Sequence, residues 1–130
     1  MPQMRMREAA VLLGVSDDTV RRWAESGRLA TTRDEAGRQV VDGVDLAALA
    51  RSLADEPEPS RESARNHLTG IVTRVLRDGV MAQVDLQAGP FRLVSLMSRE
   101  AADELGLEVG VLATASVKAT QVVIALPSGR

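Results

Sequence analysis

Residues 54–60, ADEPEPS, decide how this chain folds, because they divide it into two parts of different character. The stretch contains two prolines and three acidic residues, and it shows no apolar periodicity. Proline removes a backbone hydrogen-bond donor and disfavours helix in the residue before it. We therefore interpret residues 55–62 as an acidic, proline-containing linker between one domain at 1–54 and another at 63–127.

Composition narrows the classes of function before any motif is considered. The chain has 130 residues, enough for one ordinary domain or two small ones. It has no cysteine, which excludes disulfides, thiolate zinc sites and cysteine nucleophiles. Its single histidine, His67, argues against a histidine-based metal site or a Ser/His/Asp triad. No base, nucleophile or metal constellation appears, so we expect a protein that is not an enzyme.

Charge and hydropathy indicate the compartment and the classes of partner. The formal net charge of −2 offers no support for nucleic-acid binding, so only a local cluster of arginines could support it. The N-terminus lacks the apolar region of a signal peptide, and no apolar run approaches the roughly 18 residues of a membrane span. We expect a cytoplasmic protein with no membrane partner.

The sequence before the linker has the period of helices. Ala9, Leu12 and Leu13 have i, i+3, i+4 spacing, and Gly14 ends that segment. Ser16 is a good N-cap for a second helix. Weak alternation around a glycine-centred turn predicts a hairpin from about residue 29 to 41, and DLAALARSLA returns to helix. The pattern predicts two helices joined by a short turn, a hairpin and a final helix.

The second helix, residues 16–25, has a polar outward face that suits a DNA groove. Val20 and Trp23 face inward, and a helix that enters a major groove needs outward side chains that reach bases or phosphates. Arginines on the hairpin could follow an adjacent backbone or minor groove. The candidate DNA-binding residues are Ser16, Thr19, Arg21, Arg22, Arg33 and Arg38.

Two stretches carry a family resemblance: REAAVLLGVSDDTVRRWAESGRL (7–29) and GRQVVDGVDLAAL (37–49). Together they resemble the winged helix-turn-helix of the MerR and excisionase families over roughly residues 5–53. The resemblance implies that helix 16–25 is the recognition helix, that hairpin 33–40 is the wing and that the partner is double-stranded DNA. An alternative is that the arginines only solvate a small helical domain. Asp17 and Asp18 place negative charge where phosphates approach and should weaken binding.

The sequence after the linker has the pattern of strands. Apolar-rich runs occur in LTGIVTRVL (68–76), around the Asp78-Gly79 hairpin signal, and in FRLVSLM (91–97), VLATASVKA (111–119) and QVVIAL (121–126). Ser98 caps a short helix that runs through Leu105. We predict five strands and a two-domain α+β fold class. It combines a mostly α, winged helix-turn-helix N-terminal domain with a C-terminal, OB-like small β-barrel that carries one short helix.

Three groups of polar residues in the second half could hold an anion. A tetrahedral dianion requires fixed N–H groups, hydroxyls and one or two cationic side chains, with no need for metal-ligating residues. The first group lies before the first strand, the second at the start of the short helix and the third near the last strands. Their members are Ser63, Arg65 and Asn66; Ser98; and Lys118, Ala119 and Thr120. Sequence alone leaves open whether they meet.

The segments SARNHLTGIV, VSLMSREAADELGL and VKATQVVIAL resemble the molbindin domain, also called the Mop or TOBE domain, over 63 to about 126. The family binds molybdate or tungstate, usually at interfaces between subunits or repeated domains. The resemblance implies that all three groups hold the oxyanion. In structural terms, Arg65 could instead pair with an acid, Lys118 could be a solvated strand end and Ser98 only a helix cap. His67, at the variable position of SARNHL, is interpreted as a surface residue.

Together the two halves resemble a ModE-like regulator with a single Mop domain. They predict a molybdate- or tungstate-responsive DNA-binding transcriptional regulator whose Mop domain forms a homo-oligomer, either a dimer or a hexamer. A long C-terminal dimerisation helix of the MerR type is absent from the sequence. Two alternatives stay open: a molybdate storage protein whose helical domain is an interaction module, and a DNA-binding protein whose Mop domain only assembles subunits.

Overall fold

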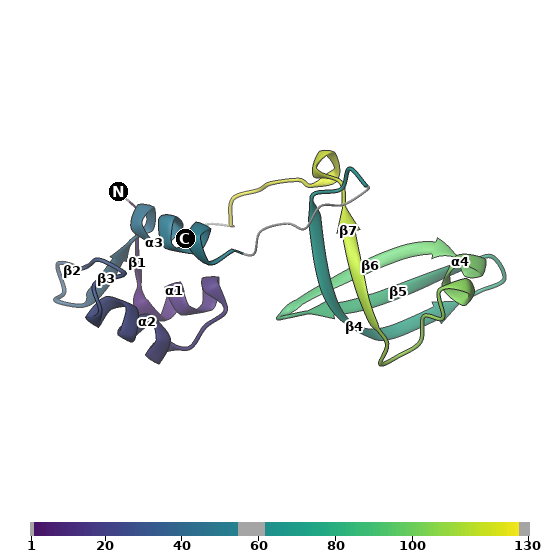
Figure 1. The fold of residues 1–130 in the computed structure, drawn as a ribbon, viewed down its shortest axis with the longest axis horizontal. Helices are drawn as coiled ribbons and strands as arrows, with labels where there is room; N and C mark the ends of the chain where they lie inside the picture. Colours follow the sequence, from purple (N-terminus) through teal and green to yellow (C-terminus); the bar gives the residue numbers. More distant parts are fainter. Residues whose placement is uncertain (1, 55–61, 128–130) are drawn as a thin grey trace. The chain divides into compact units, whose positions relative to one another are not determined.

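The computed structural model describes residues 2–54 and 62–127, which belong to two compact units, Met1–Glu56 and Pro57–Arg130. The first unit is mainly helical and the second is an antiparallel sheet with a short helix, as Figure 1 shows. The predicted α+β fold class is therefore confirmed. Of the predicted linker at 55–62, only Glu62 lies within the described residues.

The first unit combines three helices with a small antiparallel sheet. The sheet has the strand order β1-β3-β2, and β2 and β3 form the predicted hairpin. β1 had no counterpart in the prediction, because three residues are too few to show a period. The elements are β1 (Gln3–Arg5), α1 (Met6–Leu13), α2 (Asp17–Glu25), β2 (Thr31–Arg33), β3 (Gln39–Asp42) and α3 (Gly43–Leu53).

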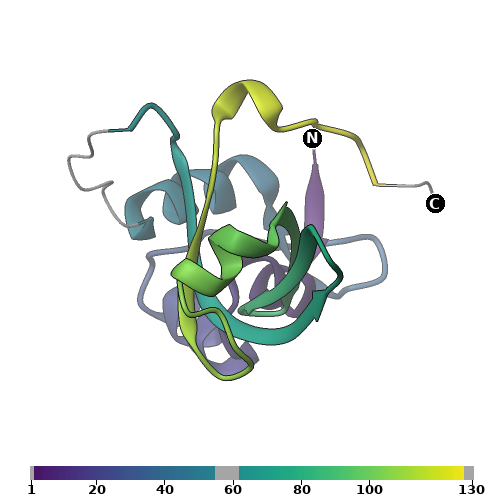
Figure 2. The same cartoon turned by 90° about the vertical axis from the view of Figure 1, so that its right-hand side faces the viewer.

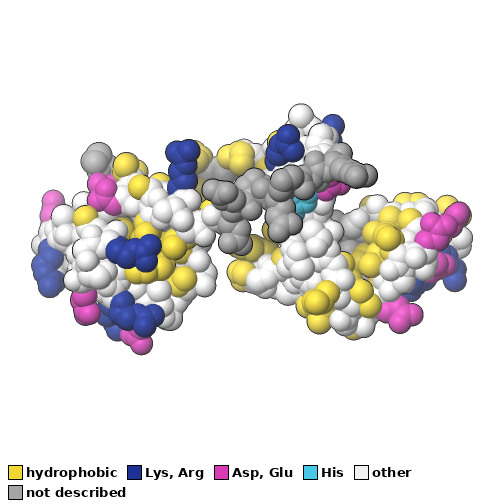
Figure 3. Space-filling model, viewed as in Figure 1, with side chains coloured by type: hydrophobic (Ala, Val, Ile, Leu, Met, Phe, Trp, Pro, Cys, Tyr) yellow, Lys and Arg dark blue, Asp and Glu magenta, His cyan; other side chains and the backbone are white. Residues whose placement is uncertain are grey.

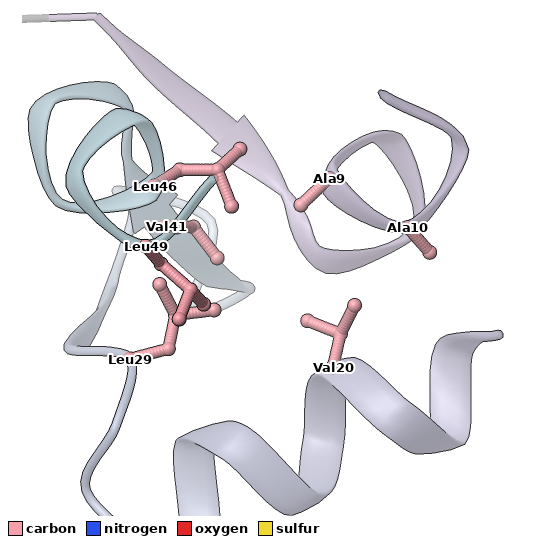
Figure 4. Packing of buried hydrophobic residues seen from close by; sticks show 7 residues of the cluster. All are labelled: Ala9, Ala10, Val20, Leu29, Val41, Leu46 and Leu49. Atoms are coloured by element: carbon pink, nitrogen blue, oxygen red, sulfur yellow. The ribbon is translucent and has the colours of Figure 1, made fainter. Parts of the chain in front are cut away.

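A single apolar cluster holds these elements together, and Figure 4 shows its side chains converging from α1, α2, β3 and α3. Val20 of α2 is fully buried, and Trp23 packs against the cluster from one turn further on. On α1 the buried residues are Ala9 and Ala10, whereas Leu12 is 66% exposed. The helical period of α1 was therefore predicted correctly, but Leu12 points to solvent. The cluster consists of Ala9, Ala10, Val20, Leu29, Val41, Leu46 and Leu49.

The second unit is a curled antiparallel sheet with the strand order β6-β5-β4-β7. The Asp78 carboxylate accepts the backbone N–H groups of Val80 and Met81 and so closes the predicted hairpin turn. Helix α4 lies at one end of the sheet beside β5 and β6 (Figure 1). The elements are β4 (Asn66–Arg77), β5 (Met81–Ala88), β6 (Phe91–Ser98), α4 (Arg99–Glu104), β7 (Leu112–Val117) and the 3-10 turn η1 (Ala119–Gln121).

The fifth predicted strand, QVVIAL at 121–126, is wrong for the chain as the structure describes it. Gln121 closes η1, and residues 122–127 have no regular secondary structure. A strand requires a neighbouring backbone to bond to, and the segment pairs with no strand among residues 2–54 and 62–127. Within residues 62–127 the sheet therefore has four strands, and it forms a half-barrel with β6 and β7 as free edges.

The sheet curls because the long strand β4 pairs with two different strands along its length. Its first half pairs with β7 and its second half with β5, and Ile71 takes part in both pairings. At Gly70 the backbone of β5 comes so close that an added Cβ would collide with the Gln87 carbonyl oxygen. An irregularity between Val72 and Arg74 bends the strand further. The close approach of β5 to β4 thus depends on Gly70, which has no side chain.

One charge is buried in this sheet, and it is fully bonded. Asp85 is 4% exposed and accepts hydrogen bonds from Gln83 Nε2 at 3.1 Å and from Arg92 Nε and Nη2 at 3.0 and 2.9 Å. The Gln83 and Arg92 hydrogen bonds hold the pKa of Asp85 below its usual value. The carboxylate therefore stays ionised, and it fixes β5 to β6 from the face opposite the apolar core.

Gly70→Ala tests the close crossing of β4 and β5. The added methyl must displace backbone rather than a side chain, so we expect the free energy of unfolding of the second unit to fall by about 1–3 kcal/mol. Gly79→Ala is the matched control, because its Cβ would have no atom within 4 Å and its φ is not positive. Urea unfolding followed by far-UV circular dichroism measures both variants. Equal midpoints for the two would contradict the crossing.

Candidate functional site

At the N-terminus of α2, three of the side chains that were predicted to face DNA form hydrogen bonds with one another. Ser16 Oγ accepts the Thr19 backbone N–H at 3.1 Å, and the two hydroxyls lie 2.9 Å apart. Arg22 Nη2 donates to Thr19 Oγ1 at 3.2 Å. Since Val20 on the opposite side is fully buried, the orientation of the helix is fixed. The structure therefore brings Ser16, Thr19 and Arg22 together.

Arg21 lies beside them and forms an ion pair with an acid of its own helix. Its Nη1 is 2.9 Å from Asp18 Oδ1, and the two side chains are 62% and 83% exposed. An ion pair this exposed contributes only about 0–1 kcal/mol and is screened by salt. Arg21 can exchange Asp18 for a phosphate at little cost. Arg21 and Gln39 line the same depression, so this part of α2 lies next to the start of β3.

The hairpin that was predicted as a wing is stabilised by hydrogen bonds to Asp34 in its turn. Asp34 accepts the N–H groups of Ala36 and Arg38 and pairs with Arg38 Nε at 3.0 Å. These bonds, foremost that from the Arg38 backbone, lower the pKa of Asp34. Arg33 Nη1 donates to the Gly37 carbonyl at 2.8 Å. Both arginines are thus positioned by a rigid turn, and both remain exposed.

In the second unit the register of the sheet brings two of the three predicted donor groups together. Asn66 begins β4 and pairs with Val117, the last residue of β7. Its Nδ2 also donates to the Val117 carbonyl at 3.0 Å, which links positions 51 residues apart. The residues on either side of this link, Ser63 and Arg65 before it and Lys118 to Thr120 after it, therefore flank one end of the β4–β7 pair.

This end of the sheet presents two exposed cations and the first N–H groups of η1. The first bond of η1 runs from Gln121 N to Lys118 O at 2.8 Å, so the N–H groups of Ala119 and Thr120 have no partner inside the turn. Arg65 and Lys118 are exposed, and within the part of the chain that the structure describes neither takes part in a salt bridge. Free cations beside free N–H groups are suited to an oxyanion.

Ser98 does not join the other predicted ligands within one chain. It is the N-cap of α4, and its Oγ accepts the Ala101 N–H at 3.0 Å. It pairs with Met81 at the start of β5, and that start lies beside Arg77 at the far end of β4. Most of the length of β4 separates Ser98 from Asn66. In the single chain Ser98 therefore acts as a helix cap.

His67 has a structural role that the sequence did not reveal. Its Nε2 donates to the Ala64 carbonyl at 3.0 Å, and its Nδ1 lies 2.9 Å from the Ser116 hydroxyl and 3.5 Å from Glu62 Oε1. The ring therefore fastens the segment that carries Ser63 and Arg65 to β7. The histidine is part of the framework of the candidate site. Only the register of β4 against β7 places Ser116 opposite it, and the sequence does not contain that register.

Comparison with known proteins finds a matching domain model for each of the two units. A helix-turn-helix domain model matches residues 4–54, and a TOBE domain model matches residues 62–124. Over 63 residues the chain is 41% identical to molybdenum-pterin-binding protein 2 of Clostridium pasteurianum and covers 93% of it. The chain belongs to the TOBE family. The two family resemblances inferred from the sequence, to a helix-turn-helix domain and to a Mop domain, are confirmed.

Two further relatives extend the TOBE comparison. The chain is 35% identical over 102 residues to molybdenum-pterin-binding protein MopA of Rhodobacter capsulatus, but it spans only 38% of MopA. The cytoplasmic molybdate-binding protein ModG, in a crystal structure with molybdate bound, is 39% identical with a TM-score of 0.50. That similarity covers 52% of this chain and 49% of ModG.

In the described residues, no helix has the length and apolarity needed to cross a membrane.

His67→Ala tests whether the His67 ring fastens residues 63–66 to β7. Loss of two hydrogen bonds, of which the one to Ala64 is partly buried, should lower the free energy of unfolding of the second unit by about 1–2 kcal/mol. Ser116→Ala removes only one of the two bonds, so a smaller loss is expected. Urea unfolding measured by circular dichroism follows the sheet, while the fluorescence of Trp23 reports the first unit separately. A wild-type midpoint for His67→Ala would contradict this role.

Proposed function

We propose that this TOBE protein is a molybdate-responsive, DNA-binding transcriptional regulator. The observation that carries the proposal is the Asn66–Val117 link, which sets two groups of anion donors side by side in a domain related to ModG. The same chain carries a helix-turn-helix domain, so a ligand site and a DNA-binding element are covalently joined. We further propose the domain bounds 1–54 and 63–127 for these two parts.

The donor set suits a tetrahedral dianion. Arg65 and Lys118 supply two positive charges for two negative ones, and Ser63, Asn66 and Thr120 add donors that can reach different oxygens. The free N–H groups at Ala119 and Thr120 add fixed dipoles. Molybdate and tungstate share this charge and shape, so the proposal covers both. The site requires no bare metal cation.

Self-association completes the proposed site. Ser98 lies at the far end of β4 from Asn66, so its hydroxyl can meet the other donors only if it comes from a second copy. A site shared between copies makes ligand binding and assembly mutually dependent, because ligand binds the assembled form alone. We propose a homo-oligomer formed through the TOBE domain, with a dimer as the smallest form and a hexamer as a larger one.

The DNA-binding element is proposed to use α2 as a recognition helix of the MerR/excisionase type and β2–β3 as its wing. Arg21 and Arg22 project from α2, and Arg33 and Arg38 from the hairpin. Joining two copies supplies two recognition helices, which suits an operator with two half-sites. A cytoplasmic regulator of this kind transmits ligand binding to DNA by changing how the two helices are spaced.

Two observations favour other functions and define the competing hypotheses. Asp17 and Asp18 lie in the first turn of α2, where they repel phosphate. They favour a molybdate storage protein whose helical unit binds another protein. The incomplete ligand set of a single chain favours a DNA-binding protein whose TOBE domain only assembles subunits. The first hypothesis predicts no preferred DNA site, and the second predicts no molybdate binding.

Molybdate should raise the melting temperature of the second unit. A ligand at a hundredfold excess over its Kd stabilises the folded state by about 2.7 kcal/mol. Lys118→Ala and Arg65→Ala each remove a charged donor and should weaken binding about tenfold or more. Arg74→Ala, a cation further along β4, is the control and should bind normally. Thermal unfolding with and without molybdate measures the melting temperature. Calorimetric titration with molybdate, tungstate and sulfate measures the affinities, and absence of heat with molybdate would exclude the ligand site.

DNA binding should depend on salt and on Arg22. Arg22→Ala removes a phosphate or base contact, so affinity should fall and the slope of log K against log salt should decrease by about one. Arg51→Ala, in the last turn of α3, changes the net charge equally and serves as the control. Fluorescence anisotropy with DNA from upstream of the protein's own gene gives both quantities. Equal slopes for the two variants would exclude α2 as the reading element.

A further inference from the structure

The outer face of α1, formed by Arg7, Glu8, Val11 and Leu12, carries two large apolar side chains that remain exposed. Val11 and Leu12 are 75% and 66% exposed, and all four residues line one depression. Residues four apart lie on the same side of a helix, so Arg7 stands above Val11 and Glu8 above Leu12. On the visible face of the first unit, Figure 3 shows exposed apolar side chains beside cationic ones. The outer face of α1 therefore combines an apolar pair with one charge of each sign.

Both charges of this face are available to a partner. Within residues 2–54 and 62–127, neither Arg7 nor Glu8 takes part in a salt bridge. Glu8 Oε1 accepts the Arg5 backbone N–H at 3.3 Å, and a carboxylate has further acceptor sites for a cation. The two charges cancel, so the face favours neither a purely acidic nor a purely basic surface. It suits a partner that also presents one charge of each sign.

We propose that the outer face of α1 binds the same face of a second copy, with the two helices side by side and running in the same direction. An interface about a two-fold axis uses one patch twice, so that patch has to complement itself. A patch with one acid, one base and two apolar residues meets this requirement. Arg7 of each copy then faces Glu8 of the other, and Val11 of each faces Leu12 of the other.

Helix geometry gives this pairing. Each residue is rotated by about 100° from the one before it and lies about 1.5 Å further along the axis. Arg7 and Val11 therefore lie on one side of the midline of the outer face, and Glu8 and Leu12 on the other. A two-fold axis parallel to the helices sets opposite sides of the two copies against each other at nearly equal height. An antiparallel pair would instead place each charge against an apolar side chain.

The pairing leaves the candidate DNA-binding side chains uncovered. Ala9 on the inward face of α1 and Val20 of α2 converge on one apolar cluster, as Figure 4 shows. The outer face of α1 consequently points away from α2, and Arg21 and Arg22 stay accessible to DNA. Because each α2 is packed on its own α1, the α1 pair also sets the distance between two recognition helices. That distance determines the spacing of the half-sites that two copies bind.

The contact is small and therefore depends on a tether. Two faces of four residues bury less than the roughly 1,000 Å² of a specific interface. The proposal rests here on the self-association proposed above for the second unit, whose curled sheet Figure 2 shows. That assembly keeps two first units together at an effective concentration on the order of millimolar. Such a concentration populates a contact that is too weak to form between free chains.

Cross-linking of the full chain tests the pairing. The protein has no cysteine, so Val11→Cys introduces its only thiol. Position 11 lies near the midline of the face and close to its copy, so a glutathione redox buffer should give a disulfide-linked dimer. Val44→Cys, at a site on α3 that is 59% exposed, is the control and should give at least tenfold less dimer. Equal yields for the two variants would overturn the pairing.

Charge reversal in the Val11→Cys background tests the partner. Arg7→Glu leaves only acids on the face and Glu8→Arg only bases, so each alone should lower the dimer yield about threefold or more. When the two variants are produced together, acids face bases, and mass spectrometry should find mixed dimers in excess of matched ones. Arg51→Glu on α3 changes the net charge as Arg7→Glu does and should leave the yield unchanged. Equal effects of Arg7→Glu and Arg51→Glu, or no excess of mixed dimers, would contradict the proposal.

The particle mass separates the α1 pairing from the self-association on which it rests. Light scattering on the same samples should give at least two chains per particle for the wild type, Val11→Cys and Val44→Cys alike. A single-chain mass would overturn the self-association of the second unit. Absence of the disulfide-linked dimer in Val11→Cys would overturn the α1 pairing at any particle mass.

Discussion

The second unit depends on a steric constraint at one residue. β4 must pair with β7 and then with β5, and the change of partner occurs where the β5 backbone passes over Gly70. A side chain there would collide with the Gln87 carbonyl oxygen and force the β5 backbone to shift. Such a shift would disturb the packing of Val72 on β4 against Val84 and Leu86 on β5.

The two units differ in how their exposed arginines and lysines are paired. On α2 and the hairpin, arginines are paired with acids of the same element, as in Arg21–Asp18 and Arg38–Asp34. These pairs hold the side chains in place and can be exchanged for a phosphate. At the β4–β7 end, Arg65 and Lys118 make no such pair with any described residue. The first arrangement suits a polymer that is bound and released, and the second suits a small anion that is enclosed.

Sequence reasoning was accurate where local patterns decide structure and failed where distant backbone decides it. The Ser16 and Ser98 caps, the hairpin turn at Asp78 and the period of α2 were all predictable, because each depends on residues within four positions. Of the candidate site, the sequence named the donor groups. It could not show that Asn66 meets Val117, that Ser98 lies at the opposite end or that His67 bridges two segments. These facts are properties of strand register, which apolar alternation does not fix across 50 residues.

The β4–β7 pairing also determines the order in which the second unit folds. The β4–β5 and β5–β6 pairs are hairpins between neighbouring strands, whereas the Asn66–Val117 link spans 51 positions. Closing the longer loop costs more chain entropy, so we expect the three-stranded meander to form first and β7 to dock last. The two donor groups therefore meet only in the final step. In a newly made or partly unfolded chain these two groups of polar residues are therefore still apart, and their meeting marks the completion of folding.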